Sequence, residues 1–166
     1  VPKLDAGPVL IKSKIKILKD TNFENLSDEL SKLGSKLILK SIDLIENKKD
    51  KYIDQDESQA SYAKKVEKSE AKINWNEKAK FILAKINALN PNPGSWFEYK
   101  DSRLKIIKAI EVEQQGKPGQ IMNNKFTIAC SENAIQILEI KKEGKKGMSV
   151  SEYLKGNELI IGTNVG

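Results

Sequence analysis

Few residue types in this chain could catalyse a reaction by themselves. The 166 residues include no histidine and a single cysteine, Cys130. A thiol nucleophile needs a neighbouring base, and a serine nucleophile of the Ser-His-Asp kind needs a histidine. These residues therefore cannot form such a site. Cys130 ends the apolar run Phe126-Thr127-Ile128-Ala129-Cys130, so we expect its thiol to pack as a small hydrophobic group in a strand.

Metal and nucleotide sites also lack the spacing that they require. No cluster of cysteine and histidine occurs, and the carboxylates Asp54, Asp56 and Glu57 lie in a polar stretch where we expect them to be solvated. The turn Gly116-Lys117-Pro118-Gly119 lacks the glycine spacing of a phosphate-binding loop. We therefore expect no bound metal.

Grouped lysines are the side chains best suited to bind a partner. The chain carries 29 basic and 23 acidic residues, a net charge of +6. Ammonium groups suit phosphate rather than base edges, so lysines would position a nucleic-acid backbone without reading its sequence. Taken alone, the pattern favours an ordinary solvated surface, because the excess charge is spread evenly along the chain. The two groups are Lys64, Lys65, Lys68 and Lys72, and Lys141, Lys142, Lys145 and Lys146.

Asp5 is the remaining candidate for chemistry, within Leu4-Asp5-Ala6-Gly7-Pro8. A carboxylate can manage the proton of an attacking amine, but one carboxylate cannot form an oxyanion hole. From the residues alone, Asp5 is best interpreted as a turn residue before Gly7 and Pro8.

Residues 1–48 predict one strand followed by one long helix. Over residues 9–17, apolar side chains alternate with lysines, which is the pattern of a half-buried strand. Thr21 and Glu24 have capping-box spacing, and apolar residues then recur every three or four positions through Ile45. On its own this unit would expose the apolar stripe and promote association. The stripe is better explained as one side of a hydrophobic core whose other side lies outside this unit than as a surface for docking a partner.

Residues 49–75 read as a linker, because charges alternate there and few residues are apolar. Residues 76–166 then predict a small domain with a helix capped by Asn76 that ends before Pro91. Short antiparallel strands suit a small closed barrel, since closure removes exposed edges. The expected fold class is therefore α+β. The expected strands are 96–99, 104–112, 120–122, 125–130, 134–140 and 159–161, with a short helix at 149–154 capped by Ser149 and Glu152.

Four motifs follow one another along the chain. They are Leu4-Asp5-Ala6-Gly7-Pro8, the Tyr-Ala-x-Lys…Glu-Ala-x-Ile-x-Trp segment from Tyr62 to Trp75, Asn90-Pro91-Asn92-Pro93-Gly94-Ser95-Trp96, and Gly144-Lys145-Lys146-Gly147-Met148-Ser149. In this order they resemble the motifs of the methionyl-tRNA formyltransferases. The chain departs from the family's pattern at Asn74, Asn92 and Gly147, where the family favours Asp, Trp and Ala.

The resemblance implies a fold and a separate role for each part of the chain. Residues 1–48 would be the last strand and helix of a Rossmann-like α/β formyltransferase domain, and residues 76–166 an OB-like antiparallel β-barrel that binds tRNA. Asp5 would be the last catalytic residue, while the family's catalytic Asn and His and most of its folate cleft would lie upstream of Val1. The chain would then hold tRNA without being active alone.

The resemblance also implies the substrates. The family transfers a formyl group from 10-formyltetrahydrofolate to the amino group of initiator methionyl-tRNA. The lysines of the first group would face the acceptor end of the tRNA from the linker, and those of the second group would line the RNA side of the barrel. The family points to the bacterial cytoplasm or an organelle. No apolar run of about 18 residues predicts a membrane span, and no protein partner is implied.

Two alternatives remain open. One is a related folate-dependent formyltransferase that acts on another amine, and the other is a barrel that binds RNA without any catalysis. The Gly144–Ser149 loop is more similar to that of the tRNA enzyme, and Asp5 within its motif argues against a mere binding module.

Overall fold

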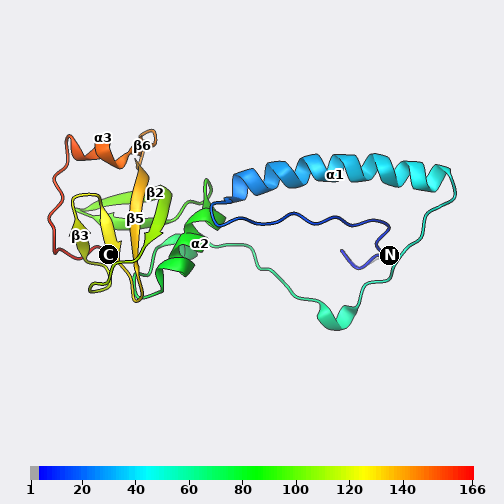
Figure 1. The fold of residues 1–166 in the computed structure, drawn as a ribbon, viewed down its shortest axis with the longest axis horizontal. Coiled ribbons are helices and arrows are strands. Elements are labelled where there is room, and N and C mark those ends of the chain that lie inside the picture. Colours follow the sequence, from blue (N-terminus) through cyan, green and yellow to red (C-terminus); the bar gives the residue numbers. More distant parts are fainter. Residues whose placement is uncertain (1–3) are drawn as a thin grey trace. The chain divides into compact units, whose positions relative to one another are not determined.

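The computed structural model describes residues 4–166, which fall into two compact units (Figure 1). The N-terminal unit contains residues 4–21 and 25–65. The C-terminal unit contains residues 22–24 and 66–166. The expected domain boundaries after residues 48 and 75 stay predictions. Within the described part of the chain, no helix is long and apolar enough to cross a membrane.

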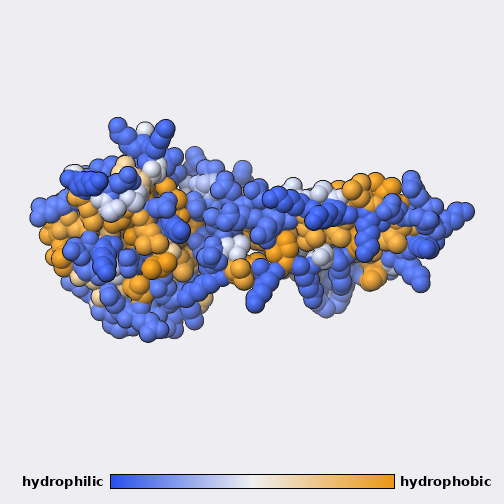
Figure 2. All heavy atoms as spheres, turned by 45° about the horizontal axis from the view of Figure 1, so that its top comes forward, coloured by the Kyte–Doolittle hydropathy of each residue, from blue (hydrophilic) through white to orange (hydrophobic). Residues whose placement is uncertain are grey.

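The N-terminal unit is built around α1 (Phe23–Glu46), which confirms the predicted helix. None of the 24 residues of α1 is buried, and Ile38 in its apolar stripe is 63% exposed. Figure 2 shows hydrophobic side chains gathered in patches on the half of the molecule that carries α1. Polar side chains separate these patches, as the amphipathic pattern requires.

The predicted strand over residues 9–17 is wrong. The backbone there is extended but unpaired, except for one isolated antiparallel bridge between Val9 and Ile53 with N···O distances of 2.8 and 3.0 Å. An alternating pattern becomes a strand only where a neighbouring strand supplies the remaining hydrogen bonds. Among the described residues of this unit, only Ile53 supplies them.

The C-terminal unit is a curled antiparallel sheet with helices packed against it, so the α+β class is confirmed at this level. The strand order is β1-β2-β5-β4-β3, and β6 pairs with β5. Two details differ from the sequence prediction: β6 was not expected, and residues 159–161 form no strand. The strands are β1 (Trp96–Tyr99), β2 (Ser102–Val112), β3 (Ile121–Asn123), β4 (Thr127–Ala129), β5 (Ala134–Lys142) and β6 (Met148–Ser149).

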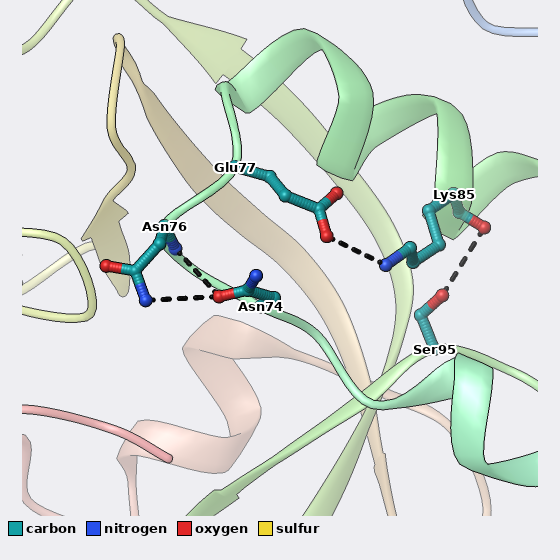
Figure 3. Close-up of polar contacts among 5 residues, drawn as sticks. All are labelled: Asn74, Asn76, Glu77, Lys85 and Ser95. Atoms are coloured by element: carbon teal, nitrogen blue, oxygen red, sulfur yellow. Dashed lines mark hydrogen bonds and ion pairs between the residues drawn. The ribbon is translucent and has the colours of Figure 1, made fainter.

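The helix α2 (Ala79–Leu89) ends directly before the Asn90-Pro91 pair, as predicted. Its N-cap is Lys78 and not Asn76. Asn76 is occupied elsewhere, because its backbone N–H and its side-chain amide both donate to Asn74 Oδ1, each at 3.1 Å (Figure 3). Lys85 then links the helix to both flanking segments. Its ammonium contacts Glu77 at 3.2 Å, and its carbonyl accepts a hydrogen bond from the buried Ser95 at 3.3 Å (Figure 3).

Aromatic rings fill the space between the sheet and the helices. The ring of Phe126, which is fully buried, contacts those of Phe97, Tyr99 and Tyr153 at centroid distances of 5.8, 5.7 and 6.1 Å. Tyr153 comes from α3 (Val150–Leu154), whose predicted capping box of Ser149 and Glu152 is present. These contacts place one continuous hydrophobic core in the C-terminal unit.

Cys130 confirms its predicted structural role in this core. It is 1% exposed, and burial raises the pKa of its thiol from 9.0 to about 12. The thiol therefore stays protonated near neutral pH and packs as a small hydrophobic group.

The C-terminal residues bind both outer strands of the sheet. Gly166 and Glu98 of β1 exchange backbone hydrogen bonds of 2.7 and 3.2 Å. Ile121 of β3 donates to the carbonyl of Thr163 at 2.9 Å and accepts from Gly162 at 2.8 Å. Residues 162–166 thus span from β3 to β1, the two strands that end the hydrogen-bonded order of the sheet.

Candidate nucleic-acid interface

The β1–β2 hairpin fixes the position of the candidate site. Its two-residue turn, Lys100-Asp101, has positive φ values of 47° and 56°, the conformation that matches the twist of two paired strands. The resulting register places Trp96 opposite Lys105 and Glu98 opposite Arg103. Since side chains alternate along a strand, these four residues lie on the face opposite the core.

Trp96 and Arg103 are diagonal neighbours on this outer face, and their side chains stack. The Cζ atom of Arg103 lies 3.9 Å from the centroid of the Trp96 ring. Lys72 also approaches this ring, with its Nζ 5.4 Å from the centroid, while it forms an ion pair of 3.3 Å with Glu98. The ring is therefore a platform for cations, in the manner of a cation–π contact.

A hollow of about 600 Å³ opens beside this stack. We call it the basic hollow, because its lining includes five basic side chains and one acidic side chain, an excess of four positive charges. The Asn92-Pro93-Gly94 turn forms part of the wall. A concentration of one sign of charge in a concave surface attracts anions such as phosphate. The charged lining residues are Lys68, Arg103, Lys105, Lys141, Lys142 and Glu143.

One ammonium group of the basic hollow is held in place by the protein. Lys105 Nζ donates to the carbonyl of Pro93 at 2.7 Å. An ammonium has three N–H donors, so this group can still donate to an anion. Lys142 pairs with the buried Leu104, so its side chain lies on the core side of the sheet, where its Nζ donates to Asn157 Oδ1 at 2.9 Å and lies 5.1 Å from the centroid of the Tyr153 ring.

The structure brings some of the predicted lysines together and not others. Lys68, Lys141 and Lys142 line the basic hollow, and Lys72 lies on the Trp96 ring at its rim. Lys145 and Lys146 follow in an exposed turn and do not line it. The exposed pair Lys64-Lys65 belongs to the N-terminal unit and lines neither hollow described here. A role in RNA binding stays a prediction for all eight.

Sequence reasoning missed Trp96, Arg103 and Lys105 as binding residues. Two signals were available in the sequence. Arg103 is the only arginine in a lysine-rich chain. The turn at Lys100-Asp101 sets the strand pairing that brings Arg103 beside Trp96.

Asp5 lies in a separate hollow, of about 890 Å³, within the N-terminal unit. Asp5 is exposed and has a φ of 57°, in the left-handed region that Asp tolerates better than most residues. The side-chain amide of Gln55 donates to the carbonyls of Asp5 and Gly7, at 2.8 and 2.7 Å. Gln55 therefore holds the backbone of the loop that carries Asp5. Nearby, hydrogen bonds from Ser58 lower the pKa of Asp56.

Comparison with known proteins identifies similar chains. Residues 65–158 match the family model described as "Formyl transferase, C-terminal domain". The chain is 40% identical over 164 residues to the methionyl-tRNA formyltransferase of Pelagibacter ubique, covering 98% of this chain and 53% of that protein. It is 33% identical over 162 residues to that of Rickettsia prowazekii, covering 96% and 53%. The chain thus spans about half the length of the curated relatives it matches.

Solved structures support the similarity in fold. A variant of HypX from Aquifex aeolicus matches with a TM-score of 0.69 and 18% identity, over 98% of this chain and 33% of that one. The complex of HypX with tetrahydrofolic acid matches with the same TM-score and identity, over 98% of this chain and 32% of that one.

Proposed function

The chain belongs to the formyl transferase family, and from that premise we propose that it is the C-terminal portion of a methionyl-tRNA formyltransferase. Such an enzyme transfers a formyl group from 10-formyltetrahydrofolate to the amino group of initiator methionyl-tRNA. The relatives at 40 and 33% identity carry this name and come from bacteria, which supports a tRNA substrate and a bacterial cytoplasmic enzyme.

In this proposal the C-terminal unit is an OB-like domain that holds the tRNA by its phosphates. The observation that carries the proposal is the basic hollow, where basic residues from three separate segments of the chain converge on one surface. Lysine ammonium groups suit phosphate oxygens, and contacts to phosphate fix the position of a nucleic acid without reading its sequence. A tRNA held in this way would be positioned for chemistry that takes place elsewhere.

Asp5 is then the one catalytic residue that this chain contributes, and its carboxylate would manage the proton of the attacking amine. The described residues around it do not fit a reduced folate by themselves. Their hollow contains the four carboxylates Asp5, Asp54, Asp56 and Glu57, which would repel the carboxylates of a folate tail, and none of its lining residues is buried. We therefore expect this chain to bind tRNA without transferring a formyl group.

A salt series tests the proposal. Binding of initiator methionyl-tRNA to the chain should weaken linearly on a log–log plot against salt, with a slope of about 0.7–0.9 per phosphate contacted. Substitution Lys141→Gln, in the basic hollow, should reduce that slope by about one contact. The matched change Lys125→Gln, in the exposed turn between β3 and β4, should leave the slope unchanged.

Three results would count against the proposal. Equal slopes for the two variants would show that the basic hollow is not part of the RNA-binding surface. Equal affinity for tRNA and for an RNA duplex of unrelated sequence would favour a general RNA-binding domain. A folded chain that binds no RNA would favour a formyltransferase whose formyl acceptor is an amine other than that of methionyl-tRNA.

A further inference from the structure

The stack of Trp96 and Arg103 is a feature that phosphate binding alone does not require. The guanidinium carbon lies 3.9 Å from the ring centroid, and Arg103 is exposed whereas Trp96 is half-buried. Among the described residues, no hydrogen bond or ion pair joins the Arg103 side chain to the protein, since its closest acidic neighbour across the strand, Glu98, pairs with Lys72. A planar cation is thus held by stacking alone, with all its N–H donors available to a ligand.

We propose that the Trp96–Arg103 stack is a seat, that is, a stacking site, for one unpaired nucleobase of an RNA, whose adjoining phosphates are bound by Lys105 and Lys141. Single-stranded RNA is recognised by stacking its bases on aromatic rings and on arginine planes. A base laid on Arg103 would add a third layer to a stack that is already formed. The inference rests on the proposed RNA-binding function of the C-terminal unit and narrows it to a structural class of RNA.

The lysines beside the stack supply the anion site that such a nucleotide needs. The register of β2 and β5 places Lys105 directly opposite Lys141. Like charges at opposing positions of two strands destabilise a sheet, and an anion bound between them removes the repulsion. Lys105 is already oriented by its hydrogen bond to the carbonyl of Pro93. The position of these cations is thus consistent with a bound phosphate.

The dimensions of the basic hollow agree with this occupant. Its volume of about 600 Å³ lies within the range of about 300–1,000 Å³ that is usual for small-ligand pockets. Trp96 and Arg103 line the same hollow as Lys105 and Lys141, so base and phosphate can be held together. A paired base inside a duplex cannot reach such a stack, because its faces are covered by the neighbouring base pairs. The hollow should therefore prefer unpaired RNA over duplex RNA.

Two RNA hairpins with the same loop and equal phosphate number test the inference with the full chain, so that the unpaired bases of the loop contribute equally to both. One hairpin ends in unpaired nucleotides and the other is blunt. The chain should bind the hairpin with unpaired nucleotides more tightly. Substitution Arg103→Lys keeps the charge and removes the plane, so it should weaken binding of that hairpin about tenfold and weaken binding of the blunt hairpin much less. Lys141→Gln should weaken both.

The outcomes separate this inference from the proposed function. Equal binding of the two hairpins by wild type, or an equal loss for both in Arg103→Lys, overturns the stacking seat and leaves phosphate binding intact. No binding of either hairpin overturns the proposed function and the seat with it. Because Arg103 is exposed, its replacement should leave the urea midpoint of the C-terminal unit unchanged, and this measurement excludes misfolding as the cause.

Discussion

The helices α1 and α2 share an amphipathic sequence pattern and differ in their surroundings. Five of the 11 residues of α2 are buried against the sheet, whereas none of the 24 residues of α1 is. Period and capping residues are local properties, so they predict that a helix forms. They do not identify the surface that will cover its apolar side. The comparison therefore separates helix formation, which depends on nearby residues, from burial, which depends on a partner.

This difference has an energetic meaning. Burial of an aliphatic side chain stabilises a fold by about 1.5–3 kcal/mol relative to exposure, and α2 gains this from several residues. A helix without burial depends on backbone hydrogen bonds and local propensity, which are marginal in water. The C-terminal unit should therefore unfold cooperatively, and α1 should open more readily.

One isoleucine in each helix gives the sharpest test. Ile86 in α2 is fully buried and Ile38 in α1 is 63% exposed. Ile86→Ala should lower the free energy of unfolding by about 2–5 kcal/mol, because it removes buried methyl groups and leaves a cavity. Ile38→Ala should change it by less than about 0.5 kcal/mol. Urea unfolding followed by tryptophan fluorescence measures the effect of Ile86→Ala, since Trp75 and Trp96 lie in the C-terminal unit, and hydrogen exchange of the α1 amides measures that of Ile38→Ala. Similar losses in the two variants would contradict the comparison.

Alkaline pH should weaken the C-terminal unit through Cys130. The pKa of this thiol is raised in the folded state, so its stabilising contribution is complete below about pH 9 and declines as the pH rises towards 12. At pH 10 the loss should be about 1 kcal/mol. Urea unfolding at pH 8 and pH 10 would measure it, with Cys130→Ala as the control that lacks this contribution. Identical pH dependence in wild type and variant would show that the thiol titrates normally.

Two glycines should respond oppositely to alanine. Gly34 lies inside α1 with no atom within 4 Å of an added Cβ, so Gly34→Ala should stabilise this helix by about 1 kcal/mol. Gly119 has a φ of 83°, and an added Cβ would lie 3.2 Å from the carbonyl oxygen of Val165. Gly119→Ala should destabilise the C-terminal unit by about 1 kcal/mol. Hydrogen exchange of the α1 amides and urea unfolding measure the two effects. An increase in the stability of the C-terminal unit in Gly119→Ala would contradict this prediction.

Sequence patterns predicted the elements that depend on local residues. Both long helices, the strand Trp96–Tyr99 and the capping box at Ser149 occur where they were expected. Elements that depend on distant partners were predicted less well. Residues 9–17 alternate like a strand but have only Ile53 to pair with, and Met148–Ser149 forms a strand because β5 lies beside it.

The residues of the candidate site were also predicted only in part. Lysine runs drew attention to Lys68, Lys141 and Lys142, since adjacent charges are visible in a sequence. Arg103 and Lys105 stand singly, and only the pairing of three strands brings them to the basic hollow. Asn76 is a smaller example of a residue whose role depends on a neighbour. It was predicted to cap α2, but it donates to Asn74 Oδ1 instead, and the N-cap of the helix is Lys78.

The segment that spans the two outer strands also restricts how the C-terminal unit can meet other proteins. Many domains recruit an extended peptide by letting it join a sheet as an extra strand, through the unused backbone groups of an edge. Here Gly166 and Thr163 bond to Glu98 and Ile121, and Ile73 donates to the carbonyl of Trp96 at 2.8 Å. At β1 and β3, these backbone positions are therefore taken by the chain itself. A partner that meets the unit at either of these two strands must be recognised through side chains.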